Sequence, residues 1–265
     1  MKKLVFCLIF TLTNTITKAC VCHPEIFDNY IHADFIGEVK VLKIYKNESP
    51  DYHYYKIDAE CQTVYKGEKQ HVFYIYGSTV ENGRWTSCDL TVKENEIWLV
   101  YATKSTHGNF EFGMCTKSHK INLSHYDSLA YSKQGLANIS DSRKKERNFL
   151  LELNKHKNVF DKKYVIDDGL TFIPNIYEYL KTFKGQTFKN DLGLYKIVFN
   201  EDFSVKKVII VKSFGHRFDK KLIDFIKKQN FTNLKRIKKK GSTDGYIPML
   251  IQFYEKEKFL SHSLF

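Results

Sequence analysis

The front part of the chain alternates apolar and polar residues, which is the period of half-buried β-strands. The alternation is clearest over 34–44, and further segments rich in β-branched and aromatic residues follow at short intervals. The expected strands cover 34–44, 54–64, 72–76, 96–102 and 110–115. A short helix with proline in its first turn is expected before them, over 24–30. Short strands separated by turn signals predict a small all-β barrel or sandwich.

A helical period replaces the alternation after this region. An apolar stripe runs among lysines and arginines and predicts a helix over 140–156, capped by Ser140 or Asp141. The residues of the stripe are Phe149, Leu150 and Leu153. This helix is expected to close the first domain or to link it to a second one.

Beyond residue 170 the pattern mixes both periods. Helices are expected over 173–183 and 219–229, and strands over 193–199, 205–212 and 247–254. The order helix, hairpin, helix, strand predicts a small α+β domain.

The composition agrees with a folded protein of two domains. Of the 265 residues, 43% are hydrophobic and 27% are charged, which excludes wholesale disorder. The fold class is therefore mainly β plus α+β. The expected division is 1–19 signal peptide, 20–125 first domain, 126–167 helical linker, 168–254 second domain and 255–265 tail.

The first residues have the pattern of a secretory signal peptide. Two lysines precede an apolar run over 4–12, and a small-x-small pattern ends at Ala19. The run is too short to span a bilayer, and no later run approaches the eighteen residues that a membrane span needs. We therefore expect export and cleavage before Cys20. Lipoprotein processing, which would acylate Cys20, is the alternative, although Thr17 and Lys18 fit a lipobox poorly.

Cysteines are confined to the front half after the expected cleavage. They are Cys20, Cys22, Cys61, Cys88 and Cys115. Cysteines of exported proteins usually pair, which leaves one over. Cys20 and Cys22 cannot bridge each other in an extended strand, where alternate side chains lie ~6.5–7 Å apart, so each is expected to reach a distant partner. A zinc site is the alternative, but the C-x-C spacing and an oxidising compartment favour disulfides.

The span 20–125 resembles the netrin-like module of the tissue inhibitors of metalloproteinases. Cys20-Val21-Cys22-His23-Pro24 matches the amino-terminal C-x-C-x-P of that family, at the expected cleavage site. The resemblance continues through 33–39, 63–67, Cys88, 96–102 and Cys115. It implies an OB-type five-stranded barrel with the disulfides Cys20–Cys88 and Cys22–Cys115, which leaves Cys61 as an unpaired thiol.

The same resemblance implies a mode of protease inhibition. The α-amine and the carbonyl of Cys20 would chelate the catalytic zinc of a partner metalloprotease. The amine must be unblocked and unprotonated when bound, and disulfides must hold the segment rigid. Val21 would enter the protease's specificity pocket, with His23 and Pro24 completing the edge. The alternative is that Cys20 and Cys22 have only a structural role, as disulfides that stabilise the barrel.

This sequence departs from the family at two positions. His32 stands near the place of one partner of the family's third disulfide, and Val21 replaces a small hydroxyl residue. Val21 can fill an apolar pocket but cannot donate a hydroxyl hydrogen bond.

The rear span, about 168–254, is similar to the carboxy-terminal domain of TonB-type energy transducers. The similarity is carried by 193–199, 208–213, 218–222 and 247–253, mainly through hydrophobic periodicity and a few turn positions. Together the two resemblances imply a protein of the bacterial envelope.

Catalytic motifs are absent from the sequence. It contains no G-x-S-x-G, Walker loop, Gly-rich dinucleotide turn or HExxH. Cys61 is the one candidate nucleophile, but its acidic neighbours Asp58 and Glu60 are expected to raise the pKa of the thiol. We therefore expect no enzyme activity, no cofactor and no resident metal.

The densest basic run lies over 235–240, and the formal charge of the chain is +12. A basic OB-type barrel raises the question of nucleic-acid binding. Export argues against it, so the run is expected to be a solvated loop. Anionic lipid headgroups or an acidic partner are the alternatives.

The sequence therefore predicts an exported, non-catalytic protein-binding protein of the periplasm, the outer membrane surface or the extracellular space. Inhibition of a zinc metalloprotease through Cys20 is the first alternative. A lipid-anchored envelope protein or an uncharacterised enzyme is the second. No nucleic-acid partner is expected.

Overall fold

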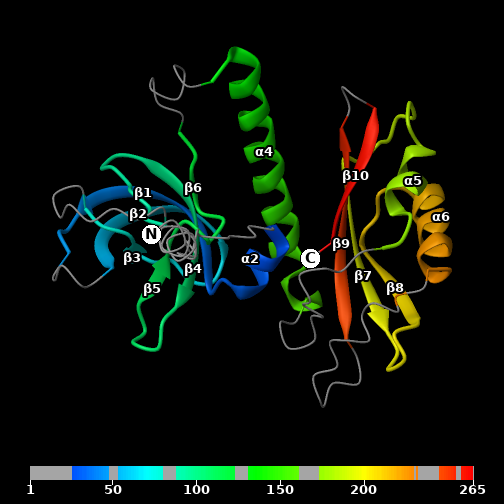
Figure 1. Cartoon of the computed structure of the whole chain (residues 1–265), viewed down its shortest axis with the longest axis horizontal. Coiled ribbons are helices and arrows are strands. Elements are labelled where there is room, and N and C mark those ends of the chain that lie inside the picture. Colours follow the sequence, from blue (N-terminus) through cyan, green and yellow to red (C-terminus); the bar gives the residue numbers. More distant parts are fainter. Residues whose placement is uncertain are drawn as a thin grey trace, which may run out of the picture. The chain divides into compact units, whose positions relative to one another are not determined.

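We describe a computed structural model of the chain (Figure 1). The described residues are 26–47, 53–79, 88–122, 131–160, 173–229, 231, 245–254 and 258–264. They form two compact units. The first is built from the described residues of 34–64 and 68–122, and the second from 26–33, 65–67 and the described residues from 131 onward.

The first unit is a closed five-stranded mixed β-barrel. Its strands are β1 (Phe35–Ile44), β2 (Tyr54–Lys66), β3 (Val72–Tyr76), β4 (Ile97–Lys104) and β5 (Phe110–Phe112). Their order is β1-β2-β3-β5-β4, and β4 pairs back with β1 to close the barrel. β3 and β5 run parallel, and a short β6 (His119–Lys120) adds to β4. This architecture is compatible with an OB-like fold.

The barrel interior is filled by the apolar half of each alternating strand. On β2, buried residues alternate with part-exposed or exposed ones from Tyr54 to Cys61, as a strand with one face in a core requires. The interior side chains include Phe35, Val39, Val41, Ile57, Phe73, Ile75, Val100 and Phe112, all nearly or fully buried. Their burial is the main stabilisation of the barrel.

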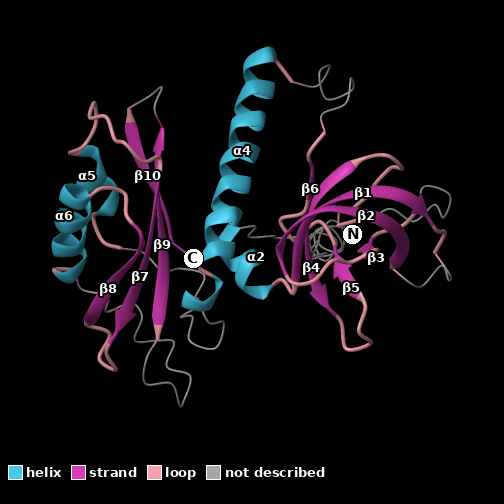
Figure 2. Cartoon of the chain, turned by 180° about the vertical axis from the view of Figure 1, so that it is seen from behind, coloured by secondary structure: helices cyan, strands magenta, loops and turns pink. Residues whose placement is uncertain are grey.

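The second unit is a four-stranded antiparallel sheet with helices on both faces. Its elements are α5 (Ile176–Lys181), β7 (Leu192–Phe199), β8 (Val205–Lys212), α6 (His216–Lys227), β9 (Tyr246–Tyr254) and β10 (Phe259–Leu264). The strand order is β10-β9-β7-β8. Figure 2 shows α5 and α6 together on one face of the sheet.

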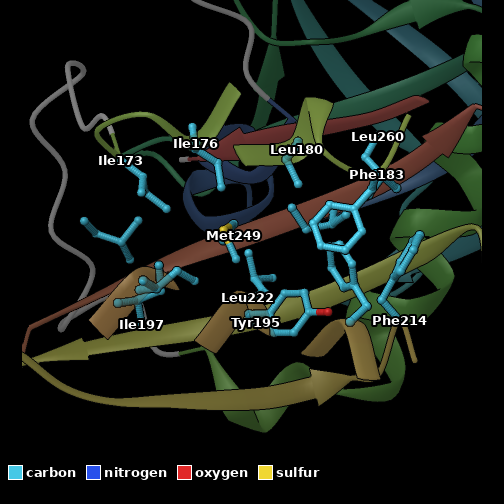
Figure 3. Close-up of a cluster of buried hydrophobic side chains, with 14 of the residues drawn as sticks. Ile173, Ile176, Leu180, Phe183, Tyr195, Ile197, Phe214, Leu222, Met249 and Leu260 are labelled. Carbon is cyan, nitrogen blue, oxygen red and sulfur yellow. The ribbon is translucent and has the colours of Figure 1, made fainter. Parts of the chain in front are cut away.

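An apolar cluster lies between α5, α6 and this face of the sheet. Figure 3 shows Leu222 of α6 and Ile176 of α5 beside Tyr195 and Met249 of the sheet. Aromatic rings extend the cluster, and Tyr179 stacks on Phe225 with ring centroids 4.1 Å apart. The apolar face of α6 therefore packs against the sheet, as its sequence predicts.

Helix α4 (Lys133–Lys155) covers the opposite face of the sheet. The ammonium group of Lys145 lies 3.8 Å from the ring centroid of Tyr254 on β9. Glu152 lies 3.2 Å from Lys212 on β8, and it also accepts a hydrogen bond from Lys155. Burial alone would raise the pKa of Glu152, but these two lysines outweigh it and lower the pKa. The helix thus belongs to the second unit.

The start of α4 differs from the expected one. The helix begins about two turns before Ser140, where Ser132 Oγ accepts a hydrogen bond of 3.1 Å from the Gly135 amide. This N-cap was missed because the first two turns carry no apolar stripe. The stripe itself is buried as predicted.

The short helix α2 (Ile26–His32) is also part of the second unit. Phe27 packs edge-to-face on Phe160, with ring centroids 5.1 Å apart. The ammonium of Lys66 donates to the carbonyls of Tyr30 and Ile31, at 2.6 and 3.1 Å. A lysine therefore satisfies carbonyl groups at the carboxy-terminal end of the helix, where a cation is favoured.

The expected strands and helices are all present among the described residues, with shifted ends. β3 and β8 have the predicted bounds. Two strands were not predicted: β6, and β10 within the expected tail 255–265. β10 pairs with β9 along its length, so the second sheet extends beyond residue 254. Among the described residues, no helix is long and apolar enough to cross a membrane.

Candidate functional site

The predicted binding edge, Cys20 to Pro24, lies outside the described residues. The expected pairing Cys20–Cys88 and Cys22–Cys115 therefore remains a prediction. Cys88 and Cys115 are themselves disulfide-bonded and not free thiols.

Cys61 is the free cysteine of the described chain, and it is buried in the barrel interior. Burial raises the pKa of its thiol, and the Gln70 amide and Lys69 offset only part of this effect. The acidic neighbours that the sequence analysis invoked are not the cause. They lie at alternate positions of β2 and point to the outside, because the strand alternates its faces. A buried, protonated thiol is a poor nucleophile.

A polar network at the start of α6 is the most chemically suggestive cluster of the second unit. Asp219 is 2% exposed, and its carboxylate accepts hydrogen bonds from Tyr195 Oη, Ser213 Oγ and the Phe214 amide. Burial and the Asp219 carboxylate raise the pKa of Tyr195. The network is buried under the helix, so we assign it a structural role. It fixes the amino-terminal turn of α6 on β7.

Metal ligands do not gather in the described part of the chain. No group of three histidine, cysteine, aspartate or glutamate side chains there could hold an ion. His23, the histidine of the predicted edge, lies outside the described residues, and so does the basic run 235–240.

The described second sheet ends in β10 on one side and β8 on the other, and the edge formed by β8 is the candidate docking site. Within the described residues, β8 pairs with β7 alone and ends the sheet. An edge strand offers a row of backbone N–H and C=O groups to another extended chain. Ile210 lies on this strand with 42% of its surface exposed, although its partner in the register, Tyr195, is fully buried. An added strand would cover this apolar side chain.

Lysines give the β8 edge a positive charge. Lys206 and Lys207 are exposed, and Lys212 contributes a third ammonium that Glu152 of α4 partly balances. Pairing with a second copy of β8 would bring like charges together, whereas an acidic segment would complement them. The edge therefore suits a different, acidic chain better than a second copy of itself.

Sequence reasoning predicted strand β8 but missed its place at the edge. Sheet order depends on which strands pair across long loops, and hydrophobic period alone does not fix it. The available signal was composition. β8 carries a lysine at three of its eight positions, while β7 and β9 are nearly continuous apolar runs.

Comparison with known proteins supplies no further assignment. No protein-family model matches the chain, and no curated protein sequence matches it.

Proposed function

We propose that this chain is an exported, non-catalytic protein-binding protein of the bacterial cell envelope or extracellular space. The carrying observation is the open edge strand β8, with a half-exposed Ile210 between lysines. The partner would add an extended, acidic segment to the sheet. Backbone hydrogen bonds would supply affinity, and the lysines would supply selectivity. The resemblance of 168–254 to the carboxy-terminal domain of TonB-type transducers supports this assignment.

Site-specific photocrosslinking in cells tests the proposal. A benzophenone side chain at Ile210 should form an adduct with the partner, and fragment mass spectrometry should locate the adduct in an extended acidic segment. The matched control is the same side chain at Tyr177, which is 61% exposed on α5 of the same unit. Position 177 should give no such adduct.

A charge reversal completes the test. Lys207→Glu should lower the adduct yield from position 210 because it places a carboxylate beside an acidic segment. Lys220→Glu, on an exposed position of α6, should not. Equal yields at 210 and 177, or equal effects of the two reversals, would show that β8 is not the docking edge.

A second function is favoured by the barrel and its cysteines. A closed five-stranded barrel, a free Cys61, and bonded Cys88 and Cys115 are what the tissue-inhibitor resemblance implies for 20–125. In this proposal Cys20 and Cys22 pair with Cys88 and Cys115, and the Cys20 amine chelates the zinc of a partner metalloprotease.

Amino-terminal extension separates this function from the first. One alanine added before Cys20 would block the chelate, so inhibition of a panel of zinc metalloproteases should disappear. Crosslinking from Ile210 should be unchanged, because β8 lies in the other unit. Full inhibition by the extended protein would exclude the chelate, and an acylated Cys20 in the exported protein would do the same.

A further inference from the structure

The outer surface of β1, β2 and β3 carries an unusual concentration of tyrosine and lysine (strands labelled in Figure 1). We call it the Tyr–Lys face. Its residues are Lys43, Tyr45, His53, Tyr54, Lys56, Tyr74 and Tyr76. The strand register brings them together, because Tyr54 pairs with Tyr76 and Lys56 pairs with Tyr74. Each of these residues is part-exposed or exposed, while their neighbours Tyr55, Phe73 and Ile75 point into the barrel.

Aromatic rings on this face contact one another at an angle. Tyr54 and Tyr76 have centroids 5.3 Å apart and ring planes at 81°. His53 lies 5.9 Å from Tyr76 at 34°. The three rings therefore form no series of parallel platforms.

Two ammonium groups are held beside the ring of Tyr45. Lys43 and Lys56 reach it from β1 and β2, with Nζ 4.7 and 4.6 Å from the ring centroid. The Tyr45 hydroxyl donates to Asp58 across 2.5 Å, and Lys56 lies 3.8 Å from the same carboxylate. The cluster of two lysines and one aspartate keeps a positive charge, with its cations placed by cation–π contacts.

The end of the face is fixed by Asn47. Its amide nitrogen donates to the carbonyls of Tyr54 and Gly77, at 3.2 and 3.4 Å, and its amide oxygen accepts from the Thr79 amide at 3.1 Å. One side chain thus ties together the ends of β1, β2 and β3. A surface fixed in this way loses little conformational freedom on binding.

We propose that the Tyr–Lys face binds an acidic oligosaccharide. Carboxylate or sulfate groups of the sugar would pair with Lys43 and Lys56, while the tyrosine edges and hydroxyls would contact the sugar rings and their hydroxyls. Single-stranded nucleic acid fits less well, because bases need open ring faces on which to stack. Here the Tyr45 ring is occupied by two ammonium groups, and Tyr54 and Tyr76 are turned edge-to-face.

This inference is independent of the proposed protein partner. The Tyr–Lys face lies in the first unit and β8 in the second, so each can fail without the other.

Fluorescence anisotropy with the full-length mature protein tests the proposal. The probes are a heparin-derived hexasaccharide, neutral maltohexaose and a ten-residue oligo(dT). The acidic hexasaccharide should bind, with an affinity that falls as salt rises, and maltohexaose should not. The double variant K43Q/K56Q should weaken binding of the hexasaccharide about tenfold. The control K184Q/K220Q removes the same charge from exposed positions of the second unit outside β8 and should change affinity less than about twofold.

Circular dichroism and thermal unfolding establish that each variant is folded. If K43Q/K56Q is unstable, K43Q alone and Y54F/Y76F replace it, since they remove one exposed ammonium or two hydroxyls and no core contact. Each should weaken binding of the hexasaccharide. Absence of hexasaccharide binding would overturn the proposal. So would an equal loss in K184Q/K220Q, which indicates general charge attraction, or tighter oligo(dT) binding that K43Q/K56Q abolishes.

Discussion

The phenol of Tyr195 on β7 donates a hydrogen bond of 2.5 Å to Asp219 on α6. The same carboxylate accepts from Ser213 Oγ and from the Phe214 amide. Three donors from the sheet and the loop thus converge on one buried acid of the helix. The hydrogen bonds from Tyr195 and Phe214 are buried and the one from Ser213 is part-buried, so the contact helps to fix the first turn of α6 on the sheet.

Replacement of Asp219 by alanine should strongly destabilise the second unit. The substitution leaves three donors without their acceptor, which costs about 3 kcal/mol or more of unfolding free energy. Urea unfolding followed by circular dichroism measures the change. Asp224→Ala on the exposed side of α6 is the control and should cost less than about 0.5 kcal/mol. Similar costs for the two variants would contradict the role assigned to Asp219.

Removal of the Tyr179 hydroxyl should have the opposite effect on stability. Its hydroxyl is buried and has no hydrogen-bond partner among the described residues, while its ring stacks on Phe225. Tyr179→Phe keeps the stacked ring and removes the unpaired group, so the variant should be as stable as the parent or more stable by about 1 kcal/mol. Loss of more than 1 kcal/mol in urea unfolding at pH 7 would show that the hydroxyl has a partner.

Alkaline pH should widen the difference in stability between the parent and Tyr179→Phe. Burial raises the pKa of Tyr179 to about 12, above its value of 10.0 in an unfolded chain. A raised pKa means that the folded state holds the proton more firmly, so this contribution is complete below pH 10 and is lost as pH rises from 10 toward 12. The parent should therefore lose stability over that range more steeply than Tyr179→Phe. If the stability of both proteins falls equally between pH 10 and 12, the raised pKa of Tyr179 is contradicted.

Much of the fold follows from local pattern. β3 and β8 have the predicted bounds because turn residues flank each of these strands on both sides. Pattern fails where a segment owes its structure to a distant partner. β10 has a weak alternation of its own, and it is a strand because it pairs with β9 from Tyr254 to Met249. The start of α4 at Ser132 depends on a side-chain cap that no apolar stripe announces.

Candidate binding surfaces are harder to predict than helices and strands, because they too depend on segments that are distant in the sequence. Tyr74 and Tyr76 alternate visibly in the sequence, yet their meeting with Lys56 and Tyr54 depends on the pairing of β2 with β3. The edge position of β8 likewise depends on β7 pairing with both β8 and β9. Both surfaces are products of strand order, which the sequence expresses only through contacts between distant residues.

Gly37 in β1 leaves no room for a side chain. A Cβ atom there would lie 2.5 Å from the Thr63 carbonyl oxygen and 2.6 Å from Phe35 Cζ, in a closed barrel where backbone cannot yield cheaply. Gly37→Ala should therefore destabilise the first unit by about 1–3 kcal/mol. Thermal unfolding measures the loss.

Gly135 in α4 is the matched control for this substitution. A Cβ there meets only ordinary contacts, the nearest 3.4 Å away at Ser132 Oγ. Alanine is a better helix former, so Gly135→Ala should be neutral or stabilise by up to about 1 kcal/mol. If both variants lose the same stability, close packing at Gly37 is not the cause.

Cys61 should be chemically inert in the native protein. Its side chain is buried among apolar residues of the barrel, and burial raises the pKa of the thiol. Iodoacetamide at pH 8 should label Cys61 only as fast as the barrel opens, and labelling in 6 M urea should be at least about a hundredfold faster. Lys69→Gln should raise the thiol pKa further, because Lys69 favours the thiolate. Labelling of the native protein at the rate of the unfolded chain would instead indicate a reactive thiol and return Cys61 to the candidates for catalysis.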